Sequence, residues 1–306
     1  MITLEGVAAR RSPLALSNIS VTWGPGVHAL LGASADGGPL LLALIAGAIR
    51  PRVGRVRVLY GAATDAPVRP QVAFVPLEPA LPGAMRVAEV FQIAAAIRGE
   101  RKPDVADRLG ALGLATLAGR AVGTLSREEA RAVAVAEAIT SMRVRVLLIE
   151  EPLLSLDARA VNRLPELLRE RSRAGWTIVI ATASVRDAAE LADDCVLLRG
   201  GVVVGQSSCV DLFARSSTSA RLRIVTSDSR ALAAALAREE RVDAVARRDT
   251  SVTVRGRDLL ELARAAARAI VASGVSLTEL RVEPPSLEEA RVAVGGMAAQ
   301  IAEEQP

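Results

Sequence analysis

A glycine-rich loop between two apolar runs constrains the fold of this chain more than any other feature. The apolar run Val27–Leu31 leads into residues 32–40, which read GASADGGPL, and an apolar stretch continues to Ile49. A strand, a glycine loop and a helix in this order form the frame of a phosphate-binding P-loop, G-x-x-x-x-G-K-[ST]. Gly32 and Gly37 stand at the spacing that this pattern requires. The sequence therefore predicts an α/β fold built around a P-loop frame.

The residues that give a P-loop its chemistry are replaced. Gly38 occupies the position of the lysine that reaches the terminal phosphates, and Pro39 that of the hydroxyl residue that holds Mg²⁺. The only lysine in the chain is Lys102, but a bias against lysine would favour arginine at this position, not glycine. Asp36 adds a carboxylate within the loop. Proline is tolerated in the first turn of a helix, so we expect the fold to survive while the phosphate site does not.

The remaining apolar pattern predicts two domains. Helical patterns alternate with short buried runs, which favours a parallel sheet of the α/β class. We expect strands at 20–23, 27–31, 53–59, 72–75, 145–149 and 177–182, and helices at 40–49, 85–98, 104–117, 127–142 and 158–174. The polar run 216–219 is suited to a linker, and the order β-α-β-β-α-β beyond it predicts a small ferredoxin-like α+β domain. The expected domains are residues 1–215 and 220–306.

Composition and motif spacing argue against several classes of function. A net charge of +4, 2% aromatic residues and arginines scattered among acidic residues give no footprint for nucleic acid. Cys195 and Cys209 have neither paired spacing nor a nearby histidine, so we expect no metal site and no disulfide scaffold. The apolar run 40–49 is too short to span a bilayer, and the first residues have no signal-peptide pattern. We therefore expect a cytoplasmic protein.

Five short motifs occur in a fixed order along the chain. They are Gly26–Gly32 before the loop, a turn pattern at Gly47, Pro51, Gly54 and Gly61, then Leu125-Ser126, Val146–Asp157 and Glu283–Glu289. Together they resemble the ATP-binding subunits of ABC transporters, and most of all the bacterial exporter type, in which ATPase and permease are separate chains. The resemblance implies a P-loop NTPase ABC cassette with a parallel core sheet, an antiparallel edge sheet and a helical subdomain.

The resemblance also implies an ATP and Mg²⁺ site, and most of its positions are altered here. The degenerate P-loop comprises Gly32, Gly37, Gly38, Pro39 and Leu40. Leu77 stands where the family has a glutamine that senses Mg²⁺ and the γ-phosphate, and Ala183 stands where it has a switch histidine. The signature L-S-G-G-Q reads L-S-R-E-E around Ser126, with bulk and two carboxylates where glycines and an amide belong. This surface is not expected to close over ATP.

Part of the second nucleotide motif survives. By the resemblance, Glu151 keeps the position of the catalytic glutamate, Glu150 stands for the Mg²⁺-linked aspartate, and Asp157 lies in the loop that crosses the dimer interface. Acidic residues after a buried strand also cap the next turn. With the other motifs altered we favour this structural interpretation, which makes Glu151 a vestige of the catalytic position.

The lost contacts are large enough to decide what to expect of nucleotide binding. Losing the lysine, the hydroxyl and one backbone N–H, at roughly 1.5 kcal/mol each, weakens binding about 10³-fold. We therefore expect no cofactor, with ATP and Mg²⁺ bound weakly at best, and no metal ligands of the protein's own.

The resemblance implies two partners. A membrane permease would hold the chain at the inner face of the cell membrane, against the apolar residues Leu81, Pro82, Met85, Val87 and Phe91. A second ABC ATPase, identical or different, would complete a homodimer or heterodimer. The predicted function is a degenerate, non-hydrolysing subunit with a structural or regulatory role in export. Two alternatives remain open: a slow or atypical ATPase that uses Glu151, and a stand-alone adaptor without a permease.

Overall fold

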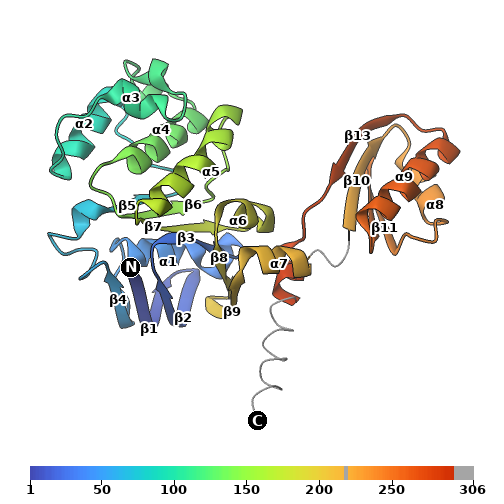
Figure 1. Ribbon diagram of the computed structural model, residues 1–306, viewed down its shortest axis with the longest axis horizontal. Helices are drawn as coiled ribbons and strands as arrows, with labels where there is room; N and C mark the ends of the chain where they lie inside the picture. The colour runs from blue at the N-terminus through green and yellow to red at the C-terminus, as the bar shows by residue number, and fades with distance from the viewer. Residues whose placement is uncertain (217–219, 293–306) are drawn as a thin grey trace, which may run out of the picture. The chain divides into compact units, whose positions relative to one another are not determined.

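The computed structural model describes residues 1–216 and 220–292 (Figure 1). Its contacts divide the chain into two compact units, Met1–Val210 and Asp211–Pro306, and each unit is described here by itself. The expected linker at 216–219 falls mostly outside the described residues. Within the described residues, no helix combines the length and the apolar character that crossing a membrane requires.

The N-terminal unit begins with a three-stranded antiparallel sheet in the order β2-β1-β4. Its strands are β1 (Ile2–Arg11), β2 (Leu14–Trp23) and β4 (Val53–Val58). Along β1 the side chains Ile2, Leu4, Val7 and Ala9 are buried, so one face of this sheet is apolar. This is the antiparallel edge sheet that the sequence predicts, although β1 itself was not assigned and β2 is longer than expected.

A six-stranded sheet forms the centre of the same unit, in the order β5-β6-β7-β3-β8-β9. The strands are β3 (Gly26–Leu31), β5 (Val72–Val75), β6 (Val146–Glu150), β7 (Thr177–Thr182), β8 (Asp194–Arg199) and β9 (Val202–Ser208). All pair in parallel except β9, which is antiparallel to β8. Every residue of β3 and β7 is buried, as expected for central parallel strands. The carboxyl ends of these strands meet at one edge, where the loops of the site lie.

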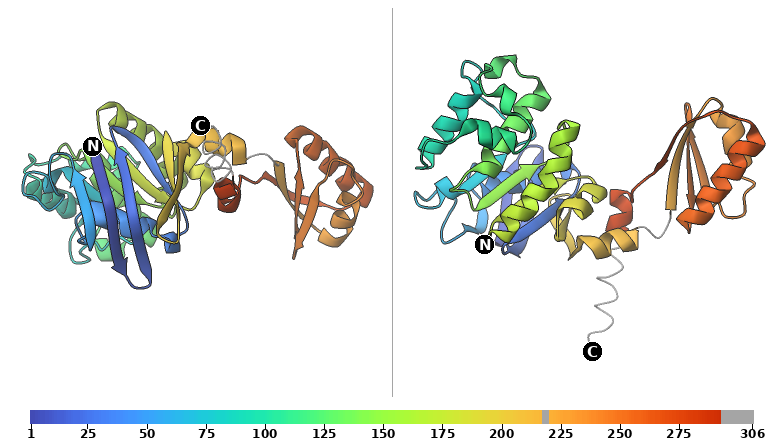
Figure 2. Two further views of the ribbon diagram at one scale, coloured as in Figure 1. Left: turned by 90° about the horizontal axis from the view of Figure 1, so that it is seen from below. Right: turned by 45° about the horizontal axis from the view of Figure 1, so that its top comes forward.

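Helices cover both faces of the central sheet. Helix α1 (Gly38–Ile45) contacts β6 and β7 on one side and β2 and β4 on the other, so it fills the space between the two sheets. Helices α5 (Ala158–Arg173) and α6 (Val185–Leu191) also contact β3 and β7. Figures 1 and 2 show them on the side of the sheet away from β1 and β2. The parallel α/β core with covered faces confirms the predicted fold class.

The helical subdomain consists of α2 (Val87–Ile97), α3 (Val105–Gly110) and α4 (Arg127–Thr140). The single helix expected at 104–117 is wrong, because α3 ends at Gly110 and a separate 3-10 turn follows at Ala115–Leu117. Gly113 between them has a φ of 76°, which a continuous α-helix does not allow. The sequence analysis left residues 184–216 unassigned, and the structure places α6, β8, β9 and α7 (Cys209–Ser216) there.

The C-terminal unit has the predicted β-α-β-β-α-β order. Its elements are β10 (Ala220–Thr226), α8 (Ser229–Leu236), β11 (Ala244–Arg248), β12 (Ser251–Gly256), α9 (Leu259–Ser273) and β13 (Leu277–Val282). The sheet order is β11-β12-β10-β13 with antiparallel pairs throughout, which is the ferredoxin-like arrangement. Leu222, Ile224, Val252 and Val254 pack against both helices as the core of this unit.

Candidate functional site

The P-loop frame lies between β3 and α1. The backbone N–H of Gly32 donates to the carbonyl of Thr182 at the end of β7, at 3.0 Å. Ser34–Asp36 form a single 3-10 turn, and Gly37 follows with a φ of 100° before α1 begins. A Cβ on Gly37 would lie 2.6 Å from Leu16 Cδ2, so both the backbone angle and the available space require glycine here. The frame predicted from the glycine spacing is present.

The carboxylate of Asp36 occupies backbone donors in and beside this loop. Its Oδ2 accepts a hydrogen bond from the N–H of Ala33 at 2.8 Å, and its Oδ1 accepts one from the N–H of Gly200 at 2.9 Å. In a functional P-loop, backbone N–H groups of this kind face phosphate oxygens. Here an oxygen of the protein already binds the Ala33 donor, and it carries the same charge sign as a phosphate.

The first turn of α1 lines a cavity of about 320 Å³. Pro39 has no backbone N–H to offer, and Leu40 is buried beside it. The other lining residues are Arg11, Ser12, Pro13, Leu14, Ala43, Ile49, Phe74, Pro76 and Glu150. One arginine, one carboxylate and a mainly apolar wall match a polyphosphate poorly, because burying such charge requires paired donors.

Glu150 lies at the end of β6 and is bound to the loop after β5. Its Oε2 accepts a hydrogen bond from the backbone N–H of Leu77 at 3.0 Å. Burial raises the pKa of the Glu150 carboxyl, and the bond from Leu77 and the charge of Arg131 act against this shift. The two positions that the family uses for Mg²⁺ and its sensor are thus joined directly to each other.

Glu151 is bound in the same way to the loop after β7. Its Oε1 accepts from the N–H of Ala183 at 3.0 Å, and its Oε2 accepts from Thr182 Oγ1 at 2.9 Å. Ala183 is exposed and has no side chain that could reach a ligand. The acidic residues after β6 therefore bind neighbouring loops, as the structural interpretation predicts.

Ser126 and Asp157 are helix N-caps. Ser126 Oγ accepts from the N–H of Glu129 at 3.1 Å, and Glu129 Oε2 accepts from the N–H of Ser126 at 2.9 Å, which forms a capping box at the start of α4. Asp157 Oδ1 accepts from the N–H of Ala160 at 2.8 Å at the start of α5. Both helices begin where these caps predict.

Sequence reasoning missed Arg131, which joins most of these loops. Its guanidinium donates to the carbonyls of five residues, Pro76, Leu77, Glu150, Glu151 and Leu154. The residue is only 1% exposed, and burial lowers the pKa of its guanidinium against the opposing charges of Glu150 and Glu151. The available signal was its register, because Arg131 shares the buried face of α4 with Val135 and Ala138.

The expected permease-docking residues separate into two groups. Val87 and Phe91 are fully buried in the helical subdomain, so the expectation that they form an exposed patch is wrong. They lie four residues apart on α2 and face the core. Pro82 is exposed, while Leu81 and Met85 are half-buried, so an apolar surface remains only in the loop before α2.

Known proteins resemble this chain over its N-terminal part. The model of the family described as "ABC transporter" matches residues 16–154. The chain is 28% identical, over 71% of its length, to the molybdate/tungstate import ATP-binding protein WtpC of Thermococcus kodakarensis, of which it covers 68%. It is 30% identical, over 69% of its length, to the Fe(3+) ions import ATP-binding protein FbpC of Brucella abortus, of which it covers 62%. It therefore spans about two thirds of the length of these curated relatives.

Solved structures share the fold. A structure described as the ATP binding subunit of an ABC transporter matches with a TM-score of 0.63 and 21% identity, over 71% of this chain and 93% of that one. The dimeric ATP-binding cassette MJ0796 bound to ADP and Pi matches with a TM-score of 0.59 and 19% identity, over 68% of this chain and 99% of that one. By its fold and by the family model that it matches, the N-terminal unit is an ATP-binding cassette domain of the ABC transporter type.

Proposed function

We propose that this chain is a non-hydrolysing ABC cassette subunit that acts as a structural or regulatory partner of a membrane permease. One observation carries the proposal: Asp36, Glu150 and Glu151 accept hydrogen bonds from the backbone of the P-loop and of the loops at Leu77 and Ala183. In the family these loops act on ATP and Mg²⁺. In this chain, protein carboxylates bind the loops to one another.

The residues around the P-loop do not fit Mg²⁺-ATP. A phosphate beside Ala33 would have to displace the Asp36 carboxylate, and Gly38 and Pro39 supply neither the cation nor the hydroxyl that would favour this exchange. The three lost contacts together weaken binding by about 4.5 kcal/mol. Repulsion from Asp36 acts in the same direction. We therefore derive no catalytic step through ATP.

The proposal names no direction of transport. The sequence predicted the exporter type from the resemblance of its C-terminal segment, whereas the curated relatives described above are named as import ATP-binding proteins. These names support a role in transport and do not support export. A permease partner and a second cassette subunit follow from what ABC cassettes work with, and they are part of the proposal, as is a place at the inner face of the membrane.

A calorimetric titration with Mg²⁺-ATP tests the nucleotide part of this proposal. We expect no saturable binding up to about millimolar ATP, because a ~10 µM site weakened 10³-fold becomes a ~10 mM site. Micromolar binding that depends on Mg²⁺ would overturn it. Measured turnover of ATP would instead favour the slow ATPase, for which the retained position of Glu151 is the supporting feature.

The partner part needs a separate test. The protein is expressed together with the permease encoded beside it, and membranes are isolated and analysed for both chains. We expect the two chains to co-purify in detergent without nucleotide. Recovery of this chain only in the supernatant would favour the stand-alone adaptor.

A further inference from the structure

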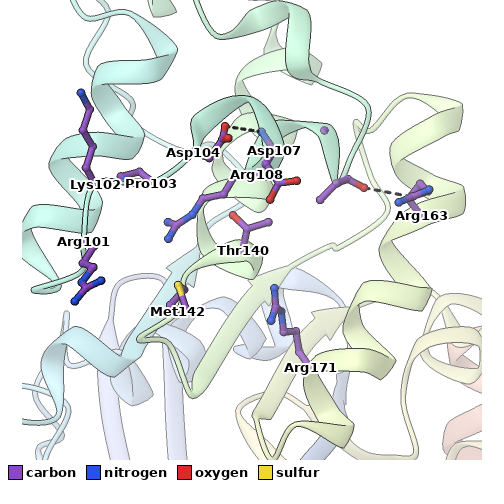
Figure 3. A pocket seen from close by; sticks show the side chains of 12 residues that line it. Arg101, Lys102, Pro103, Asp104, Asp107, Arg108, Thr140, Met142, Arg163 and Arg171 are labelled. Carbon is purple, nitrogen blue, oxygen red and sulfur yellow. Dashed lines mark hydrogen bonds between the residues drawn. The ribbon is translucent and has the colours of Figure 1, made fainter.

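A second cavity, of about 700 Å³, lies in the helical subdomain (Figure 3). Residues from four places line it: the segment before α3, α3 itself, the end of α4, and α5. It shares no lining residue with the cavity beside Pro39. Its basic lining residues are Arg101, Lys102, Arg108, Arg163 and Arg171, against two carboxylates, Asp104 and Asp107.

Arg108 is buried in the wall of this cavity with one donor unused. Its side chain is 9% exposed, and its Nη2 donates to Glu100 Oε2 at 2.6 Å. Its Nη1 is buried and has no hydrogen-bond partner. Buried guanidinium nitrogens normally have an acceptor, because an unsatisfied buried donor is unfavourable. The free Nη1 therefore indicates an acceptor that the protein itself does not supply.

Arg171 approaches the same space from α5. Figure 3 shows the guanidinium groups of Arg108 and Arg171 both directed toward the space beside Thr140. The Arg171 guanidinium carbon lies 5.2 Å from the ring centre of Trp176, and its Nε donates to the carbonyl of Ile139 at 2.8 Å. These contacts fix the group in place and leave its remaining N–H donors for a ligand.

The charge in this region is not balanced by its acidic residues. Burial lowers the pKa of Arg171, and the nearby charges of Arg108 and Arg145 lower it further, against the opposing effect of Glu170. Asp104 uses its Oδ1 to cap α3, accepting from the N–H of Asp107 at 3.1 Å. Mutual repulsion among buried cations is relieved by an anion placed between them.

We propose that this cavity is a binding site for the phosphate group of a small solute, with Arg108 and Arg171 as its two arginine ligands. Arginine suits this role because its planar group presents parallel N–H donors to the oxygens of one phosphate. The exposed residues Arg101, Lys102 and Arg163 attract the anion to the cavity. The site uses no P-loop residue, so it stands apart from the proposed function and does not depend on it.

Inorganic pyrophosphate is the probe for the test, by calorimetry and by thermal shift of the full chain. We expect saturable binding at submillimolar concentration that weakens as NaCl is raised. Arg171→Gln should weaken it about tenfold, the effect of losing one charge-assisted hydrogen bond. Arg163→Gln, an exposed change that leaves the core intact, should weaken it severalfold. Arg173→Gln, exposed on the same helix but outside the cavity, is the matched control and should leave the affinity unchanged.

Three outcomes would overturn the proposal. The first is no saturable binding up to about 10 mM pyrophosphate, since a site of two buried arginines should exceed this affinity. The second is equal weakening by Arg173→Gln, which would mean a diffuse charge effect. The third is weakening by Ala35→Glu, an exposed change in the P-loop, together with no effect of Arg171→Gln, which would place the anion at the P-loop. Vesicles of phosphatidylglycerol form the lipid arm, and binding to them but not to pyrophosphate would also contradict a small-solute site.

Discussion

The carboxylate of Glu151 accepts a hydrogen bond from the backbone N–H of Ala183 at 3.0 Å, and so joins the end of β6 to the loop after β7. Its other oxygen accepts from Thr182 Oγ1 at 2.9 Å. Glu151 has a φ of 40°, which residues other than glycine rarely adopt, and the two bonds stabilise it there. A side chain in the position of a catalytic base thus has both of its oxygens bound by the protein.

The first prediction concerns this link. We expect Glu151→Ala to lower the free energy of unfolding of the N-terminal unit by about 1–3 kcal/mol, because the Ala183 amide and the Thr182 hydroxyl lose their acceptor. Glu166→Ala, at an exposed position of α5, is the matched control and should change it by less than about 0.5 kcal/mol.

Tryptophan fluorescence during urea unfolding measures this change. The two tryptophans of the chain, Trp23 and Trp176, both lie in the N-terminal unit, so their signal reports on that unit and not on the C-terminal one. A Glu151→Ala variant as stable as the wild type would show that the two hydrogen bonds have no structural weight.

The parallel core could be read from the sequence because its strands are continuous apolar runs. Val72–Val75 and Thr177–Thr182 begin and end where expected, since burial on both faces leaves no polar residue to obscure them. The segment 184–216 was not assigned. There β9 is only partly buried and α6 is seven residues long, so neither gives a clear period.

The site could be predicted only in part, because its contacts join residues distant in the chain. The sequence indicated that Asp36 opposes phosphate, but it did not show that Asp36 binds Ala33 and Gly200. Arg131 gave no motif at all, since its partners are backbone carbonyls, which any residue could supply. Such contacts depend on the distances between loops, and a single sequence carries no record of these.

The second prediction concerns Arg131. Replacing it in Arg131→Met removes the donor of five carbonyls, and we expect a loss of about 3 kcal/mol or more in the free energy of unfolding of the N-terminal unit. Arg131→Lys keeps the charge but has only three donors, so its loss should be smaller. Arg127→Met, in the exposed first turn of the same helix, serves as the control, and a comparable loss in that variant would show that the effect is not specific to the loops.

The third prediction concerns pH. His28 Nδ1 lies 2.9 Å from Asp194 Oδ2, and Nε2 lies 3.0 Å from the carbonyl of Gly24, so both nitrogens face acceptors. Burial acts to lower the pKa of His28, but Asp194 and the Gly24 carbonyl outweigh it and raise the pKa above its ordinary 6.5. The stabilisation is therefore fully present below about pH 6.5 and is lost as the pH rises through the folded-state pKa.

We expect His28→Gln to lose more stability at pH 5.5 than at pH 8.5. The difference should be at most about 1 kcal/mol, because Asp194 is half-exposed and solvent screens the pair. Urea unfolding followed by tryptophan fluorescence at both pH values measures it. In Asp194→Asn the same pH dependence should shrink, and a loss for His28→Gln that grows with pH would reverse the assigned sign.

The fourth prediction concerns the permease contact. Met85 is half-buried in the loop before α2, next to the exposed Pro82, and an aspartate there would place a charge on the remaining apolar surface. We expect Met85→Asp to reduce the amount of this chain that sediments with membranes of cells expressing the permease severalfold or more. Ile97→Asp, at a 75% exposed apolar residue at the end of α2, is the control. Unchanged sedimentation of Met85→Asp would move the docking surface elsewhere.

The last prediction restores the missing P-loop chemistry. Gly38→Lys with Pro39→Ser returns the cation and the hydroxyl, and two contacts of roughly 1.5 kcal/mol each should raise the affinity for Mg²⁺-ATP about 10²-fold. Hydrolysis should stay absent, because Leu77 and Ala183 supply no polar side chain and Glu151 remains bound to the loop after β7. Calorimetry and phosphate release measure the two effects separately, with Pro39→Ser alone as the control that lacks the cation. If the double variant released phosphate at a rate typical of ABC ATPases, the loops at Leu77 and Ala183 would not be the barrier to hydrolysis. If it gained no affinity, Asp36 would be the dominant obstacle, and adding Asp36→Asn should then recover binding.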